Sequence, residues 1–332
     1  MAIDISVIIP SNHGHHQLVK IVEAVCSQTV RPDEIVIIDS SGESGGCPKE
    51  IIMLCTVSGI ELIYEYRVLA LPGDARNLGL RMAKAELVAL IDVHTIPRPH
   101  WLEVCLKLIA SYEVSGVWGA TCFSAETKFE RLVRDGFHGV LLRKTLPGSI
   151  FRREIFEKAG QFVDWARAGE DTEWILRLEL LRLPVVSPSE PLIDYVGLIG
   201  LSLNELLKKW YRNYSAGRDL PHLFPQRLLL WAVLYPLLIL VAFNWNYLIA
   251  DWRMDSPLYI GHLTKIVVIV PVLIYVLVRG LILPLHRGVS IWRLFPVRFV
   301  AITLICFMAD IVKVLVFSFP KRKHNVKTTF LF

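Results

Sequence analysis

The sequence lacks the cysteine spacing of a metal cluster or a disulfide framework. Its six cysteines, spread over 332 residues, form no C-x-x-C pair, which excludes a zinc-cluster protein and a disulfide-stabilised scaffold. It also lacks internal repeats, low-complexity segments and nucleic-acid-binding motifs, and its formal charge of +5 is modest. No signal-peptide pattern is present, because the first apolar run, 5–10, is short and no basic segment precedes it. We therefore expect reduced thiols, a cytoplasmic N-terminal half and no nucleic acid as a partner.

Long apolar runs are present, and they are concentrated in the C-terminal part of the chain. Hydrophobic residues make up 53% of the sequence. Residues 228–250 carry no charge, and residues 263–285 carry only Lys265 and Arg279. Each segment is long enough to cross the roughly 30 Å of a bilayer core. The sequence therefore predicts a membrane domain over 227–332 with spans at about 228–250 and 263–285.

A third apolar segment, 295–319, is interrupted by three charged residues. Arg298, Asp310 and Lys313 fall within an arc of roughly 120° at helical spacing, which suits an interfacial helix as well as one packed in a bundle. Two or three spans are therefore possible. Two spans would return the basic tail to the cytoplasmic side, as the positive-inside rule favours; its cations are Lys321, Arg322, Lys323 and Lys327. We favour two spans in the inner (cytoplasmic) membrane, with lipids as partners.

The first half alternates short apolar runs with helical patterns. Strands are predicted at 5–9, 34–38, 61–66 and 87–91, and helices at 17–27, 48–57, 74–85 and 101–111. This alternation is typical of βαβ units with a mostly parallel sheet, an α/β fold.

Polar side chains follow several of these strands. Asp92-Val93-His94 ends the run 87–91, and Asp39 ends the run 34–38. Ligands of open α/β sheets bind beyond the carboxyl ends of the strands, and Arg76 in Ala75-Arg76-Asn77 could hold a phosphate at a helix N-terminus. The alternatives are that Asp92 only caps a turn and that Asp39 only forms an Asx turn.

Two further segments carry candidate residues. Glu170 and Asp171 begin a helical pattern, where a carboxylate can serve as a general base or simply cap the helix. Ser202 and Glu205 form a capping box that opens an amphipathic helix within 201–226, expected on the membrane surface or, alternatively, packed on the soluble core. The histidines at 13, 15 and 16 lack metal-site spacing and indicate a solvent-facing loop.

These segments, in this order, resemble the membrane-bound family 2 glycosyltransferases with a GT-A fold. The matching residues cover about the first 200 positions: Val7-Ile8-Ile9-Pro10, Gln28-Thr29, Asp39, Ala75-Arg76-Asn77-x-Gly79, Asp92-Val93-His94, Gly148-Ser149 and Gly169-Glu170-Asp171. The resemblance implies a cytoplasmic catalytic domain over 1–200, followed by the interfacial helix and the membrane domain.

The resemblance also implies roles for individual residues. The residues expected to bind the donor are Pro10, Asp39, Arg76 and Asp92, and those expected to bind a divalent metal (Mn²⁺ or Mg²⁺) are Asp92 and His94. Asp171 is expected to be the catalytic base of an inverting displacement. The residues expected to contact the acceptor or support the site are Glu170, Trp174, Gly148 and Ser149. His94 replaces the second aspartate of the family's Asp-x-Asp motif. Metal affinity is therefore expected to weaken below about pH 6.5, where imidazole is protonated.

A second departure concerns the product. The processive members carry Gln-x-x-Arg-Trp where this chain has Leu206-Leu207-Lys208-Lys209-Trp210, so we expect transfer of one sugar. The donor is a nucleotide sugar, expected to be a UDP-sugar, and the acceptor is a polyprenyl phosphate or a polyprenyl-diphosphate-linked glycan in cell-surface glycan synthesis. Donor sugar, base and acceptor stay open. The competing hypotheses are a non-catalytic nucleotide-sugar-binding subunit and, with less support, a transporter.

Overall fold

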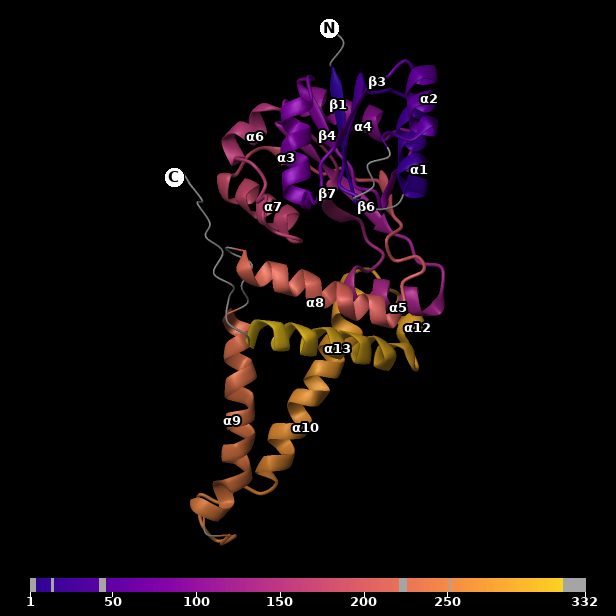
Figure 1. The fold of residues 1–332 in the computed structure, drawn as a ribbon. Coiled ribbons are helices and arrows are strands. Elements are labelled where there is room, and N and C mark those ends of the chain that lie inside the picture. The colour runs from indigo at the N-terminus through magenta and orange to yellow at the C-terminus, as the bar shows by residue number, and fades with distance from the viewer. Residues whose placement is uncertain (1–3, 13–14, 42–45, 221–225, 251, 319–332) are drawn as a thin grey trace.

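The N-terminal part of the chain is built on one mixed sheet (Figure 1). The computed structural model describes residues 4–12, 15–41, 46–220, 226–250 and 252–318. Within these residues nine strands form the sheet in the order β3-β2-β1-β4-β7-β6-β9-β5, with β8 beside β6. Their bounds are β1 Ile5–Ser11, β2 Glu34–Asp39, β3 Glu61–Tyr66, β4 Leu87–Leu90, β5 Thr95–Pro97, β6 Gly116–Phe123, β7 Arg143–Arg152, β8 Val185–Val186 and β9 Ile193–Tyr195.

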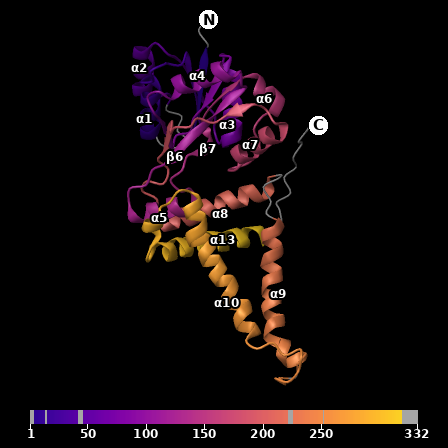
Figure 2. The same cartoon turned by 180° about the vertical axis from the view of Figure 1, so that it is seen from behind.

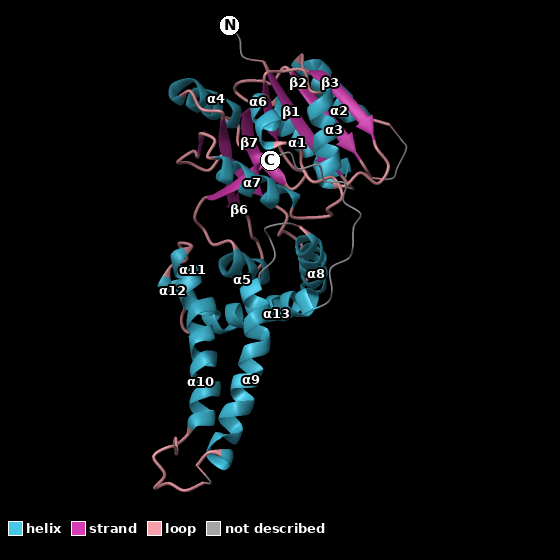
Figure 3. Cartoon of the chain, turned by 90° about the vertical axis from the view of Figure 1, so that its left-hand side faces the viewer, coloured by secondary structure: helices cyan, strands magenta, loops and turns pink. Residues whose placement is uncertain are grey.

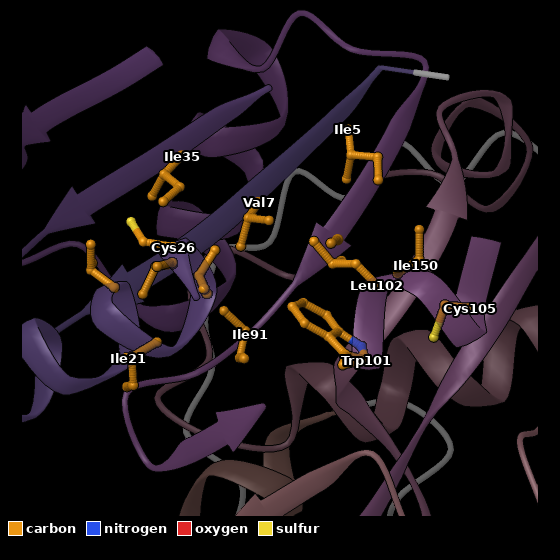
Figure 4. Close-up of a cluster of buried hydrophobic side chains, with 14 of the residues drawn as sticks. Ile5, Val7, Ile21, Cys26, Ile35, Ile91, Trp101, Leu102, Cys105 and Ile150 are labelled. Atoms are coloured by element: carbon orange, nitrogen blue, oxygen red, sulfur yellow. The ribbon is translucent and has the colours of Figure 1, made fainter. Parts of the chain in front are cut away.

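Helices cover both faces of this sheet. One face carries α1 (His15–Cys26), α2 (Lys49–Ser58) and α4 (Trp101–Tyr112), and the other carries α3 (Pro72–Met82), α6 (Glu154–Ala159) and α7 (Glu170–Leu181). Alternate residues of each strand point to opposite faces, so Val7 and Ile9 pack with the first group while Ile8 packs with the second. Figure 4 shows part of the first cluster, to which Ile5 and Ile35 of the sheet and Trp101 of α4 belong.

The strands and helices predicted for the first 111 residues are confirmed, and four of the strands pair in parallel as predicted. β1 pairs in parallel with β2 and β4, and β2 with β3. The sheet then departs from the parallel prediction, because β7 is antiparallel to both β4 and β6. The connection between β6 and β7 contains the helix α5 (Lys128–Phe137), yet the two strands pair in opposite directions. The result is a mixed α/β sheet.

The C-terminal part is helical and extends away from the sheet. Its elements are α8 (Leu203–Asp219), α9 (Gln226–Leu248), α10 (Leu263–Val276), the π-helical segment η1 (Leu277–Ile282), α11 (Leu283–His286), α12 (Ile291–Leu294) and α13 (Arg298–Ser318). α9 and α10 run side by side away from the sheet, and α8 and α13 lie crosswise between them and the sheet (Figures 1 and 2). The view in Figure 3 shows α8 on the sheet side of α13.

Two helices of the described chain are long and apolar enough to cross a membrane. They are Leu263–His286, in which 6% of the most apolar window is buried, and Arg298–Ser318, in which 33% is buried. The described part of α9 adds a shorter apolar helix, Val233–Leu248. The basic tail residues Lys321 to Lys327, and His13, lie outside the described residues. His15 and His16 begin α1, so the loop predicted for them is wrong.

The amphipathic pattern of 201–226 is realised in α8, whose capping box forms as expected. Its apolar face contacts protein, because Leu206 and Trp210 pack against Val133 of α5 and against Ile305 and Ala309 of α13. α8 is therefore held between the sheet domain and α13.

Candidate active site

A cavity of about 680 Å³ lies at the carboxyl ends of the parallel strands. The ends of β1 and β4 supply Pro10 and Asp92, the start of α7 supplies Asp171, and α8 closes the opposite side. Parallel strands place their carboxyl ends at one edge of the sheet, which is where α/β proteins bind ligands. The lining includes six of the residues predicted for the site: Pro10, Arg76, Asp92, His94, Glu170 and Asp171.

Arg76 joins the two acidic parts of this cavity. Its Nη2 donates to Asp92 Oδ1 at 2.8 Å, and its Nη1 donates to Glu170 Oε1 at 2.5 Å. The guanidinium stands 5.7 Å from the centroid of the Phe162 ring, and its side chain is only 4% exposed. Burial alone would lower the pKa of Arg76, but Asp92, Glu170 and Asp171 outweigh it and raise that pKa. Arg76 is therefore a fixed cation that holds the end of β4 to the start of α7.

The first turn of α7 carries the paired carboxylates. Gly169 precedes it with φ +89°, a left-handed conformation that glycine adopts without a side-chain clash. Asp171 Oδ1 accepts from the backbone N–H of Thr172 at 2.7 Å, and Asp171 remains partly exposed in the cavity. Burial, opposed by Arg76 and reinforced by Asp171, raises the pKa of Glu170. The exposed member of the pair is thus Asp171, while Glu170 is buried against Arg76.

Asp92 and His94 lie in the turn after β4. Thr95 fixes this turn, since its hydroxyl donates to the Asp92 carbonyl at 2.6 Å and accepts from the Asp92 N–H at 3.0 Å. Desolvation and the cations Lys209 and Arg212 lower the pKa of His94, against the raising effect of Asp92. The imidazole is therefore neutral over a wider pH range than a free histidine and can act as a ligand to lower pH than the sequence alone predicted.

Asp92 and His94 could hold a metal ion only if a bound substrate supplies further donor atoms to that ion. Within the described ranges there is no group of three or more metal-ligating side chains. One carboxylate oxygen of Asp92 is taken by Arg76, which leaves its second oxygen and the His94 imidazole. A carboxylate oxygen with a neutral imidazole suits Mn²⁺ better than Mg²⁺, which prefers oxygen alone. These two residues could therefore hold a metal together with an oxygen-rich ligand such as a diphosphate.

Asp39 does not line either of the two cavities described here. It is buried at the end of β2, where its carboxylate accepts from the Tyr64 hydroxyl at 2.7 Å and from the N–H and hydroxyl of Ser41 at 3.0 Å. The hydrogen bonds between Asp39 and Ser41 form the Asx turn that was the alternative prediction for Asp39. Ser40, and not Asp39, lines the cavity. Residues 42–45, which follow this turn, lie outside the described residues.

Gly148, Ser149 and Trp174 lie in the core. Trp174 is fully buried and donates to the Gly160 carbonyl at 2.9 Å. Ser149 accepts from the Gly119 N–H at 2.8 Å, which ties β7 to β6. Gly148 has φ +85°, and a side chain there would meet Ile193. These residues support the site from behind and do not line it.

The polar face of α8 lines the cavity, which the sequence alone did not predict. It contributes Glu205, Lys208, Lys209, Arg212 and Asn213, at helical spacing. The amphipathic pattern separated these cations from the apolar residues, but it did not show that they would face the sheet domain. Ser40, Arg167 and Tyr195 were also missed, because each lies in a loop or on a short strand without a motif.

A sheet with parallel strands, a cavity at their carboxyl edge and antiparallel strands beyond is the arrangement of the GT-A fold. Residues 6–165 match the family described as glycosyl transferase family 2. The match covers 160 of the 332 residues and lies within the sheet domain. A comparison with curated proteins gives no match.

Three solved structures of glycosyltransferases are similar to this chain to different degrees. The mannosyltransferase PcManGT from Pyrobaculum calidifontis, in complex with GDP-Man and Mn²⁺, has a TM-score of 0.53 at 17% identity, over 94% of this chain and 86% of that one. S. aureus TarS has a TM-score of 0.46 at 13% identity, over 95% of this chain, which spans 55% of the length of TarS. TarS 1-349 in complex with UDP-GlcNAc has a TM-score of 0.46 at 11% identity, over 95% of this chain and 91% of that one.

Proposed function

We propose that the chain transfers a single sugar from a nucleotide sugar to a lipid-linked acceptor at the cytoplasmic face of a membrane. The observation that carries this proposal is the Arg76 bridge, which brings Asp92 of the strand end and Glu170 of α7 into one cavity beside Asp171. A subunit without catalytic function would have no need to keep the exposed carboxylate Asp171 in this position. The donor fits the cavity that Pro10, Asp92 and the α8 cations line.

Asp171 is the proposed general base. It takes the proton of the acceptor hydroxyl while that oxygen attacks the anomeric carbon, and the bond to the diphosphate oxygen breaks with its electron pair going to the nucleoside diphosphate. The configuration at the anomeric carbon inverts in this single displacement. A bound divalent ion, held by Asp92 and His94, would stabilise the charge on the departing diphosphate. Lys208 and Arg212 add fixed positive charge on the facing wall of the cavity.

Two substitutions test the chemistry. Asp171→Asn removes the base, so transfer to a sugar hydroxyl should fall by about 10²- to 10⁴-fold, whereas transfer to an already ionised phosphate oxygen should fall far less. Asp92→Ala should abolish both. Incorporation of a radiolabelled sugar into the lipid extract of membranes measures each rate. Asp4→Asn, an exposed carboxylate at the opposite end of β1, is the matched control. Full transfer to a sugar hydroxyl by Asp171→Asn would refute the base assignment.

The proposed membrane arrangement has two spans, α9 and the continuous α10–α11 segment. At 1.5 Å per residue, the 24 residues of Leu263–His286 extend about 36 Å, enough to cross a bilayer core. Apolar side chains along α10 are exposed, as lipid-facing residues would be. The basic segment His286 to Arg293 lies at the end near the catalytic domain, in agreement with a cytoplasmic location.

α13 is proposed to lie in the plane of the membrane surface. Its charged residues bind protein: Arg298 binds Asp135 at 3.0 Å, Asp310 binds Arg279 at 2.8 Å, and Lys313 lies 5.7 Å from the ring of Tyr214. Its opposite face carries an exposed apolar stripe, formed by Val300, Leu304, Phe307, Ile311 and Leu315. The helix also runs crosswise to α9 and α10 (Figure 3). This orientation places the stripe toward the acyl chains and leaves the charges on the protein side.

Cysteine labelling tests this topology. In sealed vesicles of known orientation, a membrane-impermeant maleimide should reach Ser318→Cys and Ser290→Cys from the same side, and Ser256→Cys from the other. The wild-type chain controls for reaction with the native thiols. Three spans would instead place Ser318→Cys on the side of Ser256→Cys.

A further inference from the structure

A second cavity, of about 490 Å³, adjoins the first. The two share Asp92, Asp171, Tyr195, Lys209 and Asn213, so the proposed base stands where they meet. From there the second cavity is walled by the start of β7, by Phe137 and His138 at the end of α5, and by Trp210 of α8. It has room for a second reactant beside the donor.

Positive charge gathers in this second cavity around His138. The side chain of Arg143, exposed at the first position of β7, forms no hydrogen bond or ion pair among the described residues. Lys209 donates to the Tyr195 hydroxyl at 3.1 Å, a neutral partner. Lys144 differs from both, because it pairs with Glu179. Arg143 and Lys209 are thus two cations in one cavity that lack a carboxylate partner among the described residues.

The effects of these cations on their neighbours show that they lie close together. Burial, followed by Arg143, Lys209 and Arg287 in that order, lowers the pKa of His138 to about 3. Burial also lowers the pKa of Arg287, with Arg143 as the next contributor. Three cations therefore act on one imidazole, and the repulsion between Arg143 and Lys209, which both line this cavity, would be relieved by a bound anion.

Aromatic contacts hold this group in place. The His138 ring stacks on Phe123 with centroids 3.9 Å apart, and Phe123 packs on Tyr195 at 4.9 Å. Lys209 lies 5.7 Å from the Tyr195 ring. Lys209, which lines both cavities, is therefore held against this stack of rings through Tyr195.

The two ends of the second cavity differ in the sign of their charge. Asp92 and Asp171 lie at the junction with the first cavity, whereas Arg143 lines the second cavity alone. An acceptor anion is repelled by the carboxylates at the junction and attracted by Arg143. A neutral hydroxyl, in contrast, can approach Asp171 and give up its proton there.

We propose that the second cavity is the acceptor site, and that Arg143 and Lys209 bind a phosphate group of the acceptor while a hydroxyl of the same molecule meets Asp171. This proposal rests on the function proposed above and narrows its acceptor to a phosphate-bearing glycolipid that reacts through a sugar hydroxyl. The transfer step is the one already described.

Binding of farnesyl phosphate to the full-length protein in detergent, measured by calorimetry, tests the anion site. Arg143→Gln should weaken binding about tenfold or more, because it removes a charge-assisted contact, and Arg143→Lys should restore part of the affinity. Arg31→Gln removes an exposed arginine that donates to the Ser58 carbonyl and lines neither cavity, and it should bind as the wild type does. Farnesol, which lacks the phosphate, should not distinguish Arg143→Gln from the wild type.

The remaining outcomes decide the source of the anion and the fate of the proposal. Displacement of farnesyl phosphate by inorganic phosphate alone at equal concentration would assign the site to free phosphate and overturn the lipid acceptor. Equal affinity of Arg143→Gln and wild type, or no binding by wild type, would also overturn it. Release of nucleoside diphosphate from nucleotide sugars by the wild-type protein is measured separately. If it occurs, only the acceptor site has failed; if it does not, the proposed function itself has failed.

Discussion

Arg76 is the residue on which the geometry of the active-site cavity depends most. It is almost fully buried and is the partner of both Asp92 and Glu170. Glu170 Oε2 is buried without a hydrogen-bond partner among the described residues, so Arg76 is the main compensation for this carboxylate. Removing one partner of a buried ion pair costs far more than removing both, since the remaining charge stays desolvated.

We therefore expect Arg76→Met to destabilise the protein by about 3 kcal/mol and to abolish sugar transfer. Adding Glu170→Gln should recover part of the stability but not the activity, because Asp92 would still lack its partner. Denaturant unfolding in detergent measures the first effect and radiolabelled sugar transfer the second. Arg81→Met, at an exposed position of the same helix, is the control. Wild-type stability in Arg76→Met would contradict the bridge.

The lowered pKa of His138 makes the free energy of unfolding depend on pH. The folded-state pKa of about 3 lies below the ordinary value of 6.5, so the unfolded chain binds the proton more readily between these two values. Stability is therefore lost as the pH falls below 6.5, by up to about 2 kcal/mol between pH 7 and pH 5. His138→Phe keeps the stack on Phe123 and should flatten this part of the pH profile of unfolding.

The control for this experiment is His100→Gln, an exposed histidine beside α4. It should leave the slope of the wild type unchanged. An unchanged slope in His138→Phe would show that other groups account for the acid sensitivity.

Sequence reasoning predicted single residues well where a strand end fixes them. Asp92 lies beyond the end of β4 as expected, because parallel strands place their carboxyl ends at one edge of the sheet, and Arg76 of α3 and Asp171 of α7 line the same cavity. Asp39 has that same position, yet its carboxylate is taken by Ser41 and Tyr64, which depends on β3 pairing beside it. Lys209 and Arg143 could not be predicted, because their approach is set by how α8 and β7 pack and not by spacing.

At the scale of elements, the contact between η1 and α13 determines whether α13 stays beneath α8. A side chain at Gly280 would come within 2.3 Å of Thr303 Oγ1 and 2.6 Å of the Phe299 carbonyl. This close approach lets Arg279 of η1 reach Asp310 of α13 at 2.8 Å. The apolar pattern alone identified these helices but not their crossing, which small residues permit.

Gly280→Val should therefore separate η1 from α13 and destabilise the protein by about 1–3 kcal/mol, the usual range for overpacking. Gly217→Ala is the matched control in α8, since a side chain there meets nothing within 4 Å. That control should stabilise the helix by up to about 1 kcal/mol, because alanine favours helix over glycine. Thermal unfolding of both variants in detergent measures the difference, and a neutral Gly280→Val would contradict the close packing.

At the scale of the whole molecule, the catalytic domain and the C-terminal helices share one apolar cluster. Val133 of α5, Leu206 and Trp210 of α8, and Ile305 and Ala309 of α13 bury one another. Residues on both sides of the predicted boundary at residue 200 line the two cavities, because α8 contributes to each of them. Sequence patterns identify elements but not which surfaces of two domains meet.

A chain ending at Leu220 should consequently aggregate. It keeps α8 but lacks α13, so Leu206 and Trp210 lose their cover. Size-exclusion chromatography without detergent measures this, with the full-length chain in detergent as the reference. A monodisperse fragment 1–220 that retains the donor cavity would show that α13 is not needed for the fold of the catalytic domain.

The most direct test of the central claim is release of nucleoside diphosphate by the purified full-length protein from a panel of UDP-, GDP- and dTDP-sugars, with Mn²⁺ or Mg²⁺. We expect slow release from one donor, dependent on the metal, faster with Mn²⁺, and lost in Asp92→Ala. Silence across the whole panel, with no donor binding by calorimetry, would contradict the proposal that this cavity transfers a sugar from a nucleotide sugar.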